Sequence, residues 1–271
     1  MTTVEIQQAV VPKLPIWQTV KAAYRDSFGN PSALLTAAAI PFVLSLLLDT
    51  AMPAEAGDLG SDILRLVLDS VAVALFEITW FRHLMLGGDA GRPGPLPAID
   101  RRLRLFLCYT LLLSLLFVPN LLVEKLVGPA VQLAPHLLVP AVFLLAASSY
   151  LFVRFAFVSL WIAVDAPERL GESWRYTRRN GLRILVAVVL VAVPILLPLF
   201  GLGIVLAIVA PELAARLESG SLDGGALWLH KAGSNILLYL YYALSCAALV
   251  RAFGLLTGWL GDRRALLERF D

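Results

Sequence analysis

Charged side chains that interrupt long apolar stretches are the residues of this chain best suited to chemistry. Glu77, Arg154 and Arg251 each lie about nine or ten residues before the end of such a stretch, roughly 14 Å along a helix. An ionisable side chain in the middle of a membrane helix costs about 2.5–3.5 kcal/mol and by default marks a functional site. Because the three residues share one depth, we predict an intramembrane charge cluster in which Glu77 pairs with Arg154, with Arg251, or with both.

A second set of charges follows one face of the stretch 62–87. At 100° per residue, five ionisable side chains fall within an arc of about 120°: Asp62, Arg65, Asp69, Glu77 and His83. A polar stripe of this kind cannot face lipid. We expect the carboxylates near its first end, including Asp49 of the preceding stretch, to be exposed to water or paired with Arg65.

Two hypotheses about these charges stay open. In the first, the buried ionic network is architectural and fixes the register of the helices without moving a solute. In the second, the polar stripe of 62–87 lines a cavity for an ion, a proton or a polar head group. A dry and fully paired cluster would favour the first hypothesis, whereas a cavity that reaches Glu77 would favour the second.

The elements that position these residues are those of a membrane protein. Hydrophobic residues make up 59% of the 271 and charged residues 15%, against about 45–50% and 25% in soluble domains. One water-soluble core cannot bury so much apolar surface, so lipid must solvate much of it. The composition excludes disorder, a coiled coil and a soluble enzyme domain, and a net charge of +2 offers no basic field for nucleic acid.

Six stretches are long and apolar enough to cross about 30 Å of hydrocarbon as helices. They cover approximately residues 32–52, 62–87, 104–123, 137–164, 183–209 and 234–260. Of the 22 Lys and Arg residues, 16 fall in alternate connecting segments, and short cytoplasmic loops are enriched in these residues. We therefore predict an all-α integral membrane bundle of six helices, one domain over 1–271, with both termini cytoplasmic in a bacterial inner membrane.

Two further segments have the amphipathic pattern of helices that lie in the membrane interface. They cover residues 15–29 and 167–179, both on the predicted cytoplasmic side. Their cations and tryptophans are the candidate contacts with anionic lipid head groups: Trp17, Lys21, Arg25, Trp174, Arg175, Arg178 and Arg179. Membrane lipids are the predicted partners, a membrane protein is a further candidate, and no nucleic acid is expected.

The sequence lacks the motifs of common catalytic and cofactor sites. Its three His residues have no metal-ligand spacing, and its two cysteines, Cys108 and Cys246, both lie in apolar runs. We therefore predict no metal, no cofactor and no enzymatic activity. The run Tyr239, Tyr241 and Tyr242 is expected to serve helix packing and interfacial anchoring rather than a substrate cage.

The stretch from Tyr150 to about Phe200 resembles a known pattern. Its residues are Tyr150, Arg154-Phe155, an acidic Asp165, then Ser173-Trp174, Thr177, Asn180-Gly181 and Arg183 before an apolar helix. The pattern resembles polytopic bacterial membrane proteins of unknown function: the YciC-like inner-membrane family and the membrane domain fused to some glycerophosphoryl diester phosphodiesterases. The resemblance implies a multi-span helical domain with an interfacial helix. Since these 271 residues hold no phosphodiesterase barrel, it implies no catalytic residue.

The function predicted from the sequence is that of a non-enzymatic scaffold or accessory protein that associates with lipid or with a partner in the membrane. The alternative is a small transporter or permease component whose pathway follows the polar stripe of 62–87.

Overall fold

The structure is a computed structural model that describes residues 12–52, 59–87, 94, 96–123, 138–166, 170–212, 216 and 224–259. These residues are mostly helical and include no strand. The all-α fold class is therefore confirmed. The first three residues of the predicted interfacial helix 167–179 and the C-terminal cations lie outside the described residues.

The helices begin and end close to the predicted boundaries. In chain order they are α1 (Ile16–Phe28), α2 (Pro31–Ala51), α3 (Leu59–Leu86), α4 (Arg101–Ser114), α6 (Leu138–Ala163), α7 (Leu170–Thr177), α8 (Gly181–Val209) and α10 (Gly224–Thr257). After α4, a 3-10 turn over Leu115–Phe117 leads into further helix up to Val123. The largest difference is at α10, which starts about ten residues early because Ala226, Leu227 and Leu229 favour helix and no proline interrupts the segment 224–233.

Polar caps set where α2 and α4 begin. The Asn30 side chain accepts the Ala33 amide at 3.3 Å, and Pro31 occupies the first position of α2. The Asp100 carboxylate accepts the Leu103 amide at 2.9 Å, and this hydrogen bond lowers the pKa of Asp100 below its ordinary value. Both caps satisfy amides that the first turn of a helix leaves unpaired.

Five helices are long and apolar enough to cross a membrane. They are Pro31–Ala51, Arg101–Val123, Leu138–Ala163, Gly181–Gly201 and Gly224–Thr257. The remaining predicted span corresponds to α3, which has 28 residues but carries too much charge to meet the same apolar criterion. The described chain therefore has the helices of a multi-pass membrane protein.

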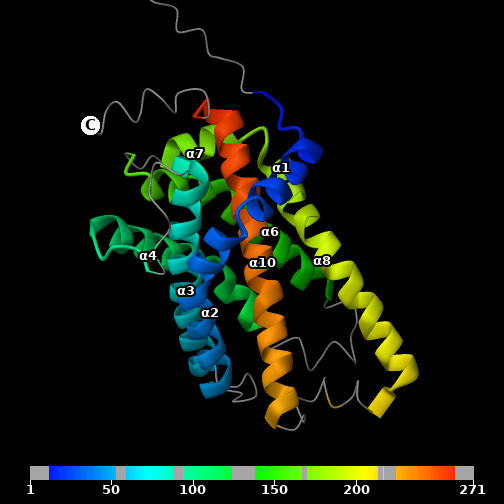
Figure 1. Cartoon of the computed structure of the whole chain (residues 1–271). Coiled ribbons are helices and arrows are strands. Elements are labelled where there is room, and N and C mark those ends of the chain that lie inside the picture. The colour runs from blue at the N-terminus through cyan, green and yellow to red at the C-terminus, as the bar shows by residue number, and fades with distance from the viewer. Residues whose placement is uncertain are drawn as a thin grey trace, which may run out of the picture.

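α10 runs through the centre of the bundle, and α1 and α7 lie at one end of it (Figure 1). The helix packs against α1, α2, α3, α6 and α8. Surrounded on several sides, it needs small or apolar side chains on each contacting face. Ala243, Ala247 and Ala248 meet this requirement, and all three are buried.

α1 packs against the bundle with its small side chains and leaves its largest apolar one outside. Ala23 and Ser27 are buried against α8 and α10, whereas Trp17 is 67% exposed. Ser27 Oγ also donates to the Ala243 carbonyl at 3.3 Å. The amphipathic segment thus forms the predicted helix, and contacts with two other helices hold it in place.

Candidate functional site: an acid-lined cavity

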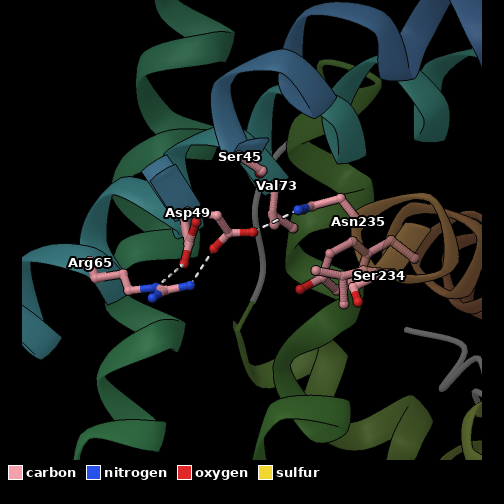
Figure 2. A pocket seen from close by; sticks show the side chains of 9 residues that line it. Ser45, Asp49, Arg65, Val73, Ser234 and Asn235 are labelled. Atoms are coloured by element: carbon pink, nitrogen blue, oxygen red, sulfur yellow. Dashed lines mark hydrogen bonds and ion pairs between the residues drawn. The ribbon is translucent and has the colours of Figure 1, made fainter. Parts of the chain in front are cut away.

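Arg65 joins the charges near the start of α3 to α2 and α10 (Figure 2). Its guanidinium pairs with Asp49 of α2 and with Asp69 one turn along α3, the latter at 3.6 Å. Asn235 of α10 donates to the other Asp49 oxygen at 2.6 Å, and Lys231 donates to the Asp49 carbonyl at 2.7 Å. The expected pairing of Arg65 with nearby carboxylates is confirmed, and Asp49 connects three helices.

This network borders a cavity of about 350 Å³. In Figure 2, Asp49 lies between Arg65 on one side and Asn235 on the other, with Ser234 close to the asparagine. The carboxylates outnumber the cation in the described wall, which holds Asp49, Asp69 and Arg65. Acidic side chains therefore outnumber basic ones in the described wall of the first cavity.

A larger cavity of about 470 Å³ adjoins the first one between α3, α4, α6, α8 and α10. Asp69, Val73 and Tyr242 line both. The described wall of the larger cavity contains the carboxylates Asp69 and Glu77 and neither Lys nor Arg. It also carries hydroxyl groups from α3, α4, α6 and α10: Ser70, Thr110, Ser114, Ser149, Tyr241, Tyr242 and Ser245. A mostly apolar pocket of about 300–1,000 Å³ with a few convergent polar groups is typical of a small-ligand site.

Glu77 lies about 12 Å beyond Asp69 along α3. Within the described part of the chain it has no hydrogen bond and no ion pair. Ser245 of α10 lines the same cavity, is only 9% exposed, and its Oγ has no hydrogen-bond partner among the described residues. Because buried polar groups are normally satisfied, two unpartnered groups on one wall indicate a place for a polar ligand or for water.

The predicted ion pair between Glu77 and the intramembrane arginines is not formed among the described residues. Neither Arg154 nor Arg251 has an acidic side chain within 4.0 Å in the described chain. Arg154 turns toward α7, and Arg251 is half-buried on α10. Equal depth along two helices says nothing about the direction in which a side chain leaves its helix, so the depth argument could not establish this contact.

Arg154 is buried where α6 meets α7, with 1% of its surface exposed. Its Nη2 donates to the Trp174 carbonyl at 3.0 Å, and its guanidinium carbon lies 3.7 Å from the centroid of the Trp174 ring. A cation over a tryptophan face is stabilised by about 2 kcal/mol when desolvated. An aromatic ring, and not a carboxylate, thus faces this charge.

The residues that carry the family resemblance meet at the same place. Ser173 Oγ and Thr177 Oγ1 both donate to the Arg154 carbonyl, at 2.8 and 3.3 Å. Gly181 leaves room for this contact, since a Cβ there would lie 3.0 Å from Arg154 Cδ and 3.0 Å from the Tyr150 ring. The pattern therefore builds a helix junction in this chain.

Asn180 extends the junction to the beginning of the described chain. Its buried side-chain oxygen accepts the Leu14 amide at 2.8 Å, and its nitrogen donates to the Pro12 carbonyl at 3.0 Å. Arg183 adds a hydrogen bond to the Leu14 carbonyl at 3.0 Å. Residues more than 160 positions apart are thereby held together, a contact that no local pattern in the sequence announces.

Asp165 ties the end of α6 to α3 and α4. Its carboxylate pairs with Arg102 and, at 3.6 Å, with Arg82. The residue has a φ of 58°, the left-handed conformation in which many helices end. Arg82, near the end of the polar helix, is thus satisfied at the same end of the bundle as α7.

The other residues of the predicted stripe lie outside the larger cavity. His83 stacks on Trp80 with ring centroids 5.2 Å apart, and Asp62 belongs to the first turn of α3. The stripe is therefore divided: Arg65 and Asp69 belong to the paired network, and Glu77 faces the cavity.

The candidate head-group contacts of α1 and α7 are exposed at their end of the bundle. The exposed cations are Lys21, Arg25, Arg175, Arg178 and Arg179. Arg25 pairs with Asp26 at 3.1 Å and Arg175 with Glu172 at 3.9 Å. Trp174 is 43% exposed while one face of its ring contacts Arg154, so it belongs to both the surface and the junction.

The tyrosines of α10 divide into two groups. Tyr239 is buried, hydrogen-bonded to Ser45 at 2.9 Å and packed edge-on against Phe76, as helix packing requires. Tyr241 and Tyr242 line the larger cavity instead, contrary to the expectation from the sequence. Their spacing from Ser245 places all three on one helical face, and this polar face of α10 is the signal that could have revealed the cavity.

In comparisons with known proteins, no family model, curated protein or solved structure matches the chain. The resemblance of residues 150–200 to the YciC-like family therefore stays a prediction. Within the described ranges, no group of three or more His, Cys, Asp or Glu side chains could hold a metal ion.

Proposed function

We propose that this chain is an integral membrane protein that binds a positively charged solute at Glu77 and carries it across the membrane. The observation that supports this function is the acid-lined cavity: it reaches Glu77, whose carboxylate has no ion pair among the described residues. The charge cluster of a purely architectural protein would instead be dry and paired. The proposal therefore takes the transporter alternative in preference to the scaffold, and it assigns no catalytic step to the chain.

The chemistry of the wall defines the solute. Of the two carboxylates in the described wall, Asp69 is paired with Arg65, so Glu77 supplies the negative potential of a cavity that no described Lys or Arg lines. The hydroxyl groups around them can replace water on a solute that leaves the aqueous phase. A cation would be attracted by the carboxylate and coordinated by the hydroxyl oxygens, whereas an anion would be repelled by like charge in a medium of low dielectric constant.

The proposed path requires α3 to be a sixth span. Its 28 residues extend about 42 Å as a helix, enough to cross the hydrocarbon region. Its charged face is directed at α2, at α10 and into the cavities, and so need not contact lipid. We place α1, α7 and both termini on the cytoplasmic side of a bacterial inner membrane, where their exposed cations would contact anionic lipid head groups.

Uptake of radiolabelled tetramethylammonium into proteoliposomes of phosphatidylglycerol tests this function, since this permanent cation does not cross the lipid unaided. We expect the wild type to accumulate it and Glu77→Gln to reduce the initial rate at least tenfold with normal yield of folded protein. Glu172→Gln is the matched control, because Glu172 is an α7 carboxylate that does not line the described cavities. Absent uptake by the wild type, or equal uptake by Glu77→Gln, would contradict the function and favour a scaffold.

A further inference from the structure

An apolar groove between α8 and α10 borders the acid-lined cavity. The groove has a volume of about 560 Å³ and is lined by residues between Val189 and Leu199 on α8 and between Ser234 and Tyr241 on α10. Val189 and Tyr241 also line the cavity of Glu77. The groove and the cavity therefore meet at these two side chains.

The groove lies where the bundle meets the bilayer. α8 and α10 diverge with distance from α1 (Figure 1), and the α8 side of the groove includes the exposed Val189 and Leu196. In a membrane helix such apolar side chains face lipid tails. The entrance is thus open to molecules dissolved in the hydrocarbon region.

The groove and the neighbouring cavity differ in chemistry as the tail and the head of an amphiphile do. The groove is formed by Val, Ala, Ile and Leu side chains, with Ser234 and Tyr241 as its polar members. The cavity end carries Asp69 and Glu77 and no described cation. Apolar surface favours an alkyl tail, and the carboxylates favour a positively charged head over an anionic or a neutral one.

We propose that the solute is a membrane amphiphile with an ammonium head group, which enters sideways from the bilayer between α8 and α10, places its head at Glu77 and leaves its tail in the apolar groove. This inference rests on the proposed function and specifies its substrate class. Anionic phospholipids would place a phosphate against Asp69 and Glu77, so they are not the expected occupants.

Photolabelling with a dodecyltrimethylammonium probe that carries a diazirine at the end of its tail tests this route. The protein is placed in phosphatidylglycerol nanodiscs, which contribute no ammonium group, and the labelled residues are located by mass spectrometry. We expect label within 189–199 and 234–241, and a roughly tenfold lower yield for Val193→Trp, which fills the groove, and for Glu77→Gln. Val186→Trp is the matched control, because Val186 is exposed on α8 outside the described groove lining.

The possible outcomes separate this inference from the proposed function. Label elsewhere, unchanged yield in Val193→Trp, or equal labelling by a dodecyl glucoside bearing the same diazirine would overturn the lateral route. If Glu77-dependent uptake of tetramethylammonium persisted beside such a result, the cavity would still carry small cations from water. If uptake of tetramethylammonium did not depend on Glu77, the proposed function itself would be wrong.

Discussion

Arg154 and Glu77 are two charged residues of the bundle with opposite surroundings. Arg154 is covered by Trp174, and its own carbonyl accepts two hydroxyl groups of α7. Glu77 faces a cavity and has no partner among the described residues. The arginine thus lies in a packed junction between two helices, where its Nε and Nη1 have no hydrogen-bond partner among the described residues, and the glutamate faces a cavity.

A charge inside an apolar helix is therefore not by itself a sign of ligand binding. Both side chains are costly to remove from water when ionised. At Arg154 an aromatic face and a carbonyl offset part of that cost, whereas Glu77 has neither a hydrogen bond nor an ion pair with any described residue. The partners of a buried charge, more than its presence, indicate its role.

Of the substitutions that test this difference, Arg154→Ala should have the largest effect on stability. We expect the free energy of unfolding to fall by about 3 kcal/mol, because the change empties a packed volume and removes the contact with Trp174. Arg251→Ala is the control, since Arg251 is half-buried and lacks an ion pair with any described residue; it should cost about 1 kcal/mol or less. Unfolding in dodecyl sulfate, followed by circular dichroism, measures both. Equal losses of stability in the two variants would mean that the contacts of Arg154 add no more stability than those of Arg251.

Asn180→Ala tests whether the junction is closed as far as the N-terminal segment. Loss of the side chain leaves the buried amide of Leu14 and the carbonyl of Pro12 without their partner. We expect a cost of about 2 kcal/mol and faster hydrogen exchange at the Leu14 amide. Exchange in the buried part of α10 should stay as in the wild type. Unaltered protection at Leu14 would show that the contact with Asn180 is dispensable.

Glu77→Gln should move stability in the opposite direction. The amide is nearly the same size and removes an unpaired charge from the bundle interior, so we expect the free energy of unfolding to rise by about 1 kcal/mol. The same titration in dodecyl sulfate measures it. A loss of more than about 2 kcal/mol would place Glu77 in an architectural network like that of Arg154.

Asp100→Ala should have the smallest effect on the free energy of unfolding. It provides a reference residue outside the membrane-spanning segments. Because the carboxylate accepts the Leu103 amide, the pKa of Asp100 is lower in the folded protein than in the unfolded chain. Its contribution, about 0.5 kcal/mol for an exposed cap, is present above the ordinary aspartate pKa of about 3.9 and disappears as the pH falls through the lowered value. Wild type and variant should therefore differ at pH 7 and converge near pH 2. A constant difference over this range would contradict the role of the charge.

The helices of this protein could be predicted from its sequence, because they depend on local properties. The apolar length of α2, α6 and α8, the cap at Asn30 and the amphipathic pattern of α1 each lie within one segment. The polar stripe of α3 was likewise a local pattern, and its pairing of Arg65 with Asp69 joins positions four apart.

Whether Glu77 meets Arg154 depends on how the helices pack. Arg154 and Glu77 have equal depth in the sequence, but the rotation of α6 and the fold-back of α7 direct the arginine to Trp174. The cavity exists because five helices leave space beside Glu77, with walls contributed by residues as distant as Ser70 and Leu249. Depth follows from counting along one helix, and periodicity shows which face of that helix turns inward, but the residues that this face meets depend on how several helices pack around each other.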